Sequence, residues 1–179
     1  KKKVRFVLSW NVPNCQNFWN KSSDEKENKQ WKNYYATVFE DSADSAVYSL
    51  NNWNDLFNRT LTFKNALFDT SVPKEVIDAA ASNLSVLKSP TVMRLEDGSF
   101  YGFEGVHERE GSCEGTCQHV WNYAYAMCFL FPDLERSIRD LEFKYSTDEN
   151  GRMGFRLMLP IGRKMTGFRA CVDGQMGAV

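Results

Sequence analysis

The sequence lacks the charge surplus and the apolar runs that mark two large classes of partner. Its 22 basic and 23 acidic residues leave a formal net charge of −1, so nothing favours nucleic acid or an anionic membrane surface. The longest apolar run, residues 123–131, is far shorter than the roughly 20 residues that span a bilayer. The apolar stretch at residues 4–8 is interrupted by Arg5 and is too short for a signal peptide. We therefore expect no nucleic-acid partner and no membrane span or signal peptide within these residues.

The number and spacing of the cysteines do not fit a complete disulfide framework. The five cysteines are odd in number and unevenly spaced, at positions 15, 113, 117, 128 and 171. This pattern favours a reducing compartment such as the cytoplasm. The 179 residues suffice for one domain. Because the chain does not begin with Met and stops at DGQMGAV, we expect both ends to continue in a longer protein that could carry a targeting signal.

The periodicity of apolar residues predicts a mostly helical chain. Alternation at residues 3–10 predicts one strand. From Asp41 the spacing becomes helical and predicts one long helix, straight or kinked, to about Phe68, capped by Asp41 or Ser42. Pro73 opens a second helix in the favoured cap-then-proline order. Helix pairs joined by loops that carry small hairpins predict an α-helical toroid rather than a sandwich or a doubly wound sheet.

A hairpin is predicted around Asp97-Gly98. Two short β-type runs flank this dipeptide, which is the strongest short-range hairpin signal. Because strand side chains alternate, Phe100, Gly102 and Glu104 share one face, and Glu104 stands at the end of the strand. After a glycine-containing loop, Thr116 is expected to cap the next helix.

Glu104 is the candidate for carboxylate chemistry. A glycosidase needs one carboxylate that attacks the anomeric carbon or activates water and a second that protonates the leaving oxygen. Glu104 follows two aromatic residues and lies near glycines, which let a ligand approach the backbone closely. The simpler interpretation is a solvated glutamate at a strand end.

Metal binding is an alternative interpretation of the same region. Cys113, Cys117 and His119, with His107 nearby, offer thiolate and imidazole ligands. However, their spacing is not that of a common zinc finger. If Thr116 caps a helix, Cys117 and His119 lie about 200° apart on it and cannot easily share an ion. The simpler interpretation of Cys117 is a small buried core residue.

Cysteine nucleophile chemistry is a further alternative. Cys113 or Cys117 could act with a histidine, but no third, orienting group stands at a recognisable spacing.

Several segments together resemble one enzyme family. The segments GSFYGFEG, GTCQHVWNYAYAMCFLFPDLERS, GRMGFRLMLPIG and DGQMGAV, in this order, resemble the catalytic region of glycoside hydrolase family 116. This family includes the non-lysosomal glucosylceramidase, or bile-acid β-glucosidase, and its bacterial relatives. VRFVLSWNVPN, NYYATVF and ASNLSVLKSPTVMRLEDG resemble it too, so the likeness covers essentially the whole chain.

The resemblance implies an architecture and an activity. Such enzymes have an N-terminal β-sandwich followed by an (α/α)6 barrel, so residues 1–13 would be the last sandwich strand and residues 14–179 the first part of the barrel. They are retaining glycosidases of β-glucosides or β-xylosides, and Phe103-Glu104-Gly105 matches the motif of their nucleophile. Their acid/base aspartate lies downstream of this chain. We therefore expect a fragment that is inactive alone, with no cofactor and with a β-glycoside substrate, either an oligosaccharide or a glucolipid. Membrane association belongs to one branch and is left open.

Some residues depart from the glucosylceramidase branch. Its Asn-Thr-Tyr-Asp segment is replaced here by Gly115-Thr116-Cys117-Gln118, so an aspartate that holds the sugar is absent. An amide can still exchange hydrogen bonds with sugar hydroxyls. Arg156 stands roughly where that branch has a His-Asp pair. The candidate substrate-binding residues are Thr116, Gln118, His119, Trp121, Asn122 and Arg156. The alternative from another class is a non-catalytic module that binds metal through Cys113, Cys117 and His119, or carbohydrate through its aromatic cluster.

Overall fold

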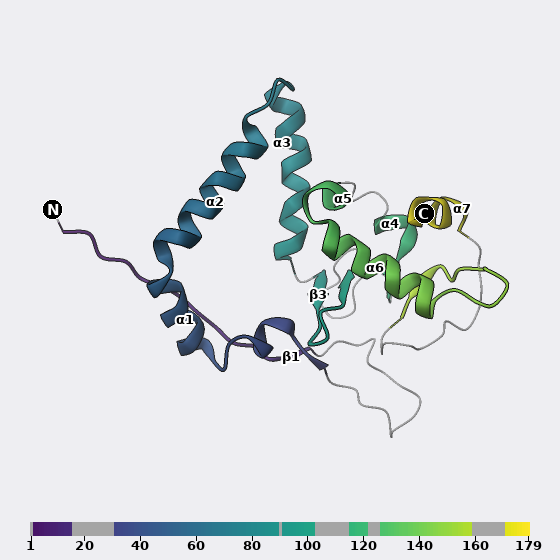
Figure 1. The fold of residues 1–179 in the computed structure, drawn as a ribbon, viewed down its shortest axis with the longest axis horizontal. Coiled ribbons are helices and arrows are strands. Elements are labelled where there is room, and N and C mark those ends of the chain that lie inside the picture. Colours follow the sequence, from purple (N-terminus) through teal and green to yellow (C-terminus); the bar gives the residue numbers. More distant parts are fainter. Residues whose placement is uncertain (1, 16–30, 90, 103–114, 122–125, 159–170) are drawn as a thin grey trace.

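The computed structural model describes residues 2–15, 31–89, 91–102, 115–121, 126–158 and 171–179 (Figure 1). The described part is mostly helical and carries small two-stranded sheets, as predicted. Its α-helices are α1 (Ser42–Asn51), α2 (Trp53–Phe68), α3 (Lys74–Ser82), α4 (Gln118–Trp121), α5 (Ala126–Leu130), α6 (Pro132–Tyr145) and α7 (Val172–Ala178). Two 3-10 helices are η2 (Tyr34–Thr37) and η3 (Asn83–Lys88). The antiparallel strand pairs are β1 (Asn14–Cys15) with β2 (Trp31–Lys32), β3 (Val92–Arg94) with β4 (Phe100–Gly102), and β5 (Thr116–Cys117) with β6 (Arg156–Leu157).

Helices α1, α2 and α3 form an arm at one side of the molecule. In Figure 1, α2 and α3 form a V that closes where the two helices are joined, and the other end of α3 leads towards the hairpin. The ring of Phe63 on α2 lies 5.9 Å from that of Phe131. Asp41 caps α1 as predicted, because its carboxylate accepts a hydrogen bond of 2.8 Å from the backbone N–H of Asp44. The single long helix that was expected is divided into α1 and α2 at Asn52, whose backbone (φ −103°, ψ 13°) leaves the helical region.

The hairpin around Asp97-Gly98 is confirmed. β3 and β4 pair in register, with Arg94 opposite Phe100 and Val92 opposite Gly102. Gly98 adopts a positive φ of 88°, which glycine accepts without steric cost. The Asp97 carboxylate accepts a hydrogen bond of 2.9 Å from the backbone N–H of Ser99 and so closes the turn locally.

The core of the described residues lies between the hairpin and α6. One buried cluster contains Leu95, Tyr101 and Leu141, and a second contains Phe100, Trp121 and Ile138. Successive residues of β4 thus enter different clusters, and α6 contributes to both. Burial of one such large apolar side chain stabilises the fold by about 1.5–3 kcal/mol, so this region holds most of the described packing energy.

The N-terminal strand expected at residues 3–10 is not formed within the described part of the chain. Residues 2–13 have no regular hydrogen-bonded structure there. The side chains of Val4, Phe6 and Leu8 are 72%, 88% and 85% exposed, because no sheet lies against them among the described residues. A strand requires a partner edge to satisfy its backbone, and alternation alone does not supply one. Assignment of residues 1–13 to a preceding sandwich stays a prediction.

Candidate functional site

The candidate nucleophile follows directly from a buried strand. β4 ends at Gly102, two residues before Glu104, and all three residues of β4 are buried. Glu104 itself lies outside the described residues, as do Cys113 and Asn122. The structure therefore describes β4, the strand that precedes Glu104. The described candidates Thr116 and Trp121 can be placed relative to its last residue, Gly102.

Thr116 and Trp121, two of the predicted substrate-binding residues, both contact Gly102. The backbone N–H of Gly102 donates a long hydrogen bond of 3.4 Å to the hydroxyl of Thr116. A Cβ atom at Gly102 would lie 1.8 Å from Cζ2 of Trp121, so the indole occupies the space of a side chain. Phe100 meets the same indole edge to face, with ring centroids 6.1 Å apart. Thr116 and Trp121 thus hold the end of β4 from two sides.

Gln118 is fully buried beside this support. Its exposed fraction is 0%, and neither amide atom has a hydrogen-bond partner among the described residues. The indole N–H of Trp121 is likewise without one there. An unsatisfied buried polar group costs about 1–3 kcal/mol, so these groups are suited to a hydrogen-bonding ligand or to residues outside the described part.

Thr116 is not the helix cap that was expected. It forms β5 with Cys117 and pairs with β6, so that Thr116 lies opposite Leu157 and Cys117 opposite Arg156. Helix α4 begins only at Gln118. The angular argument that separated Cys117 from His119 therefore fails, because these two residues do not share one helix.

Arg156 is placed in the same small sheet as Thr116. Its guanidinium lies over the ring of Phe155, 5.1 Å from the centroid, which is the geometry of a cation–π contact. The sheet brings its backbone next to Cys117.

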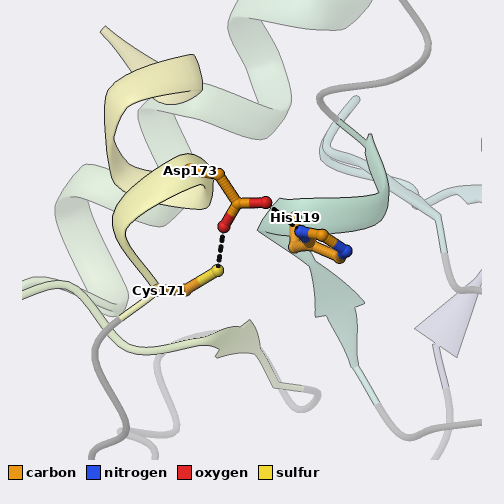
Figure 2. Close-up of side chains that lie close together, drawn as sticks. All are labelled: His119, Cys171 and Asp173. Atoms are coloured by element: carbon orange, nitrogen blue, oxygen red, sulfur yellow. Dashed lines mark hydrogen bonds and ion pairs between the residues drawn. The ribbon is translucent and has the colours of Figure 1, made fainter.

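Sequence reasoning missed a cluster of His119, Cys171 and Asp173. Figure 2 shows the carboxylate of Asp173 between the other two side chains. One oxygen contacts Nδ1 of His119, and the other accepts a hydrogen bond of 2.8 Å from the thiol of Cys171. Asp173 lies 54 positions from His119, so the sequence holds no local signal for the contact.

The protonation states in this cluster argue against Cys171 as a nucleophile, whereas the cysteine nucleophile expected from the sequence was Cys113 or Cys117. Hydrogen bonds from Cys171 and then from His119 lower the pKa of Asp173. Burial, and then the bond to Asp173, raises the pKa of the Cys171 thiol. A nucleophilic cysteine needs the opposite shift, and a base at its sulfur. Here the carboxylate separates the imidazole from the thiol, so His119 does not serve as that base.

A separate cleft lies between the hairpin and α6. Its volume is about 480 Å³. Its charged lining residues are Arg94, Arg136, Lys144, Asp97, Asp133 and Asp140. Because cations and anions are equal in number, this lining favours no ligand charge, and the cleft shares no residue with the cluster of His119, Cys171 and Asp173.

Comparison with known proteins adds no relative. No protein-family model matches the chain, and no curated protein matches it significantly. Among the described residues, no helix combines the length and apolar character that crossing a membrane requires. The likeness to glycoside hydrolase family 116 thus rests on the sequence segments that suggested it.

Proposed function

We propose that the chain is the nucleophile-bearing part of a retaining β-glycosidase similar to glycoside hydrolase family 116. The observation that carries the proposal is the support of β4 by two predicted site residues. Trp121 packs on Gly102, and Thr116 accepts its N–H, so the chain leading to Glu104 is anchored two residues before the carboxylate. A nucleophile must be held close to its reactive geometry, and such anchoring is what the mechanism needs.

The proposed reaction divides the work between two carboxylates. Glu104 attacks the anomeric carbon, and the bond to the leaving oxygen breaks as an acid protonates that oxygen. In the second step, water attacks the anomeric carbon and displaces Glu104. The acid of the first step, now deprotonated, acts as the base that takes a proton from this water. This second carboxylate is expected downstream of Val179, because the enzymes that the chain resembles have an aspartate there.

The proposed sugar contacts are the residues predicted from the sequence. The amide of Gln118 has a donor and an acceptor that the described residues leave unused, but Gln118 is 0% exposed, so a sugar hydroxyl reaches it only if the surrounding segment opens. His119 and Arg156 are further candidates, and Asn122 is a candidate outside the described residues. Trp121 is only 4% exposed, and this burial favours a supporting role beneath β4.

The decisive test traps the glycosyl-enzyme. The reading frame extended downstream of Val179 is incubated with a 2-deoxy-2-fluoro-β-glucoside that carries an activated leaving group, and the adduct is mapped by peptide mass spectrometry. Such a leaving group departs with little help from the acid, so the nucleophile is tested almost alone. We expect one adduct, on Glu104.

Matched variants make the result specific. Glu104→Gln should abolish the adduct, whereas Glu108→Gln, in the same loop, should retain it. A folded protein that forms no adduct with the glucoside or the matching xyloside would refute the proposal. Saturable sugar binding without an adduct would instead indicate a carbohydrate-binding module.

A further inference from the structure

Three different metal-ligating side chains converge at the contact between α4 and α7. His119 comes from α4, Cys171 directly precedes α7, and Asp173 lies in the first turn of α7. One ligand atom of each lies within 4.8 Å of the others. This convergence joins an imidazole, a thiol and a carboxylate from two segments that are distant in sequence (Figure 2).

The backbone holds this convergence in place. A Cβ atom at Gly174 would lie 3.0 Å from the sulfur of Cys171 and 3.3 Å from the backbone nitrogen of His119, so glycine lets α7 approach α4. The N–H of Gly174 also donates a hydrogen bond of 3.0 Å to the carboxylate of Asp173. A backbone donor on a carboxylate fixes its orientation, which is the usual arrangement around metal ligands.

We propose that His119, Cys171 and Asp173 bind a zinc ion. The choice of metal follows from the donor atoms. Sulfur and nitrogen are ligands of zinc and related transition metals, whereas calcium and magnesium prefer oxygen throughout. The inference goes beyond the proposed glycosidase and does not depend on it.

Zinc binding requires the release of one proton. The thiol proton that Cys171 now donates to Asp173 leaves to solvent, and zinc forms one bond each to the sulfur, an imidazole nitrogen and a carboxylate oxygen. Three protein ligands leave the fourth position of a tetrahedral ion to water or to an exogenous ligand. The side chains of His119 and Asp173 are 39% and 57% exposed, so an ion can enter from their side while Cys171 closes the interior side.

The test measures metal binding directly on the purified 179-residue protein. The protein is stripped with a chelator and kept reduced by a phosphine, then titrated with Zn²⁺ against a chromophoric chelator. We expect one tightly bound ion per chain. Co²⁺ should give the thiolate-to-cobalt charge-transfer band and the intense visible bands of a four-coordinate site. Calcium and magnesium should not compete.

Three substitutions assign the ligands. Cys171→Ser, Asp173→Asn and His119→Gln should each weaken zinc binding by more than the roughly 10–100-fold that loss of an outer partner costs. Cys171→Ser should also remove the charge-transfer band. Cys128→Ser and His107→Gln are matched controls, because Cys128 is exposed and His107 is the other histidine of the chain. Both should bind as the parent does.

The possible outcomes separate clearly. Absence of a one-to-one ion, or unchanged binding in these three variants, overturns the proposal. Binding that is lost in Cys113→Ser or Cys117→Ser but kept in Cys171→Ser overturns it as well. If Cys171→Ser does not fold by circular dichroism, the more exposed Asp173→Asn and His119→Gln decide the matter.

Discussion

At the scale of single residues, α6 carries a buried ion-pair cluster of one arginine and two glutamates. Arg139 forms ion pairs with Glu135 at 2.6 Å and with Glu142 at 2.8 Å, and the side chain of Glu142 is 0% exposed. Two carboxylates share one guanidinium, so the group has a net charge of −1 if both are ionised. Burial is the largest cause that raises the pKa of Glu142 to about 7, against the opposing effect of Arg139.

This pKa predicts how stability depends on pH. Between pH 4.5 and 7, the folded protein binds more protons at Glu142 than the unfolded chain does, so the free energy of unfolding falls as pH rises. The stabilising effect is complete below about pH 4.5 and is lost above pH 7. Glu142→Gln keeps the Glu135–Arg139 pair and removes the buried charge. We expect it to raise the free energy of unfolding at pH 8 by on the order of 1 kcal/mol.

Urea unfolding of both proteins at pH 5 and pH 8 measures this effect. The advantage of Glu142→Gln should shrink at pH 5, where the native glutamate is protonated. Asp133→Asn is the control, because Asp133 is an exposed residue of the same helix with a side chain that is 95% exposed. A Glu142→Gln variant that is equally destabilised at both pH values would show that the charge pair with Arg139 outweighs the desolvation of Glu142.

At the scale of elements, the packing of β4 on α4 depends on one glycine. The indole of Trp121 occupies the position that a Cβ atom of Gly102 would take. Gly102→Ala should therefore destabilise the protein by about 1–3 kcal/mol, since overpacking forces a shift of backbone or ring. Denaturant unfolding measures the loss.

A double-mutant cycle tests whether the indole causes that loss. Trp121→Leu removes the ring that clashes with the new methyl group. In this background Gly102→Ala should cost clearly less than in the parent, giving a coupling energy outside the error of additivity. Strict additivity would mean that the cost of Gly102→Ala arises elsewhere.

Elements with local signals could be predicted, and those without could not. Asp97-Gly98 marked the β3–β4 hairpin, and the cap at Asp41 marked the start of α1. β5 escaped prediction because its partner β6 lies about forty residues further along the chain, and a threonine before a helix looks like a cap. Pairing between distant segments leaves no periodic trace in two-residue strands.

At the scale of the whole molecule, the candidate site also depends on contacts between distant segments, which the sequence does not reveal. The motif around residues 116–121 predicted Thr116, Gln118 and Trp121 as site residues, and the structure brings Thr116 and Trp121 against Gly102 at the end of β4 and buries Gln118. Cys171 and Asp173 could not be joined to His119 from sequence, because the contact arises only when α7 folds back on α4. The zinc site proposed above lies at this contact between α4 and α7.

The whole molecule is also divided in its packing. Neither α1, α2 nor α3 contains a buried residue, whereas α6 buries Ile138 completely. Large apolar side chains of α2 remain open, with Phe57 at 55% and Phe68 at 45% exposed. An isolated helix of this length is marginal in water. Among the described residues, α2 gains only edge contacts, such as that of Phe63 with Phe131, whose ring centroids lie 5.9 Å apart.

This division predicts a gradient in amide hydrogen exchange. Amides of α1 and α2 should exchange by local opening with little protection, while those of α6 and β4 should open only with global unfolding. Mass spectrometry of peptides from residues 42–68 and 132–145 compares the two regions within one sample. The exposed apolar faces of the arm also favour association. The experiment is therefore repeated over a range of protein concentrations, and protection of α1 and α2 that grows with concentration would identify a second copy as their cover. Equal, concentration-independent protection of both regions would contradict the division, because α1 and α2 have no buried residue among those that the structure describes.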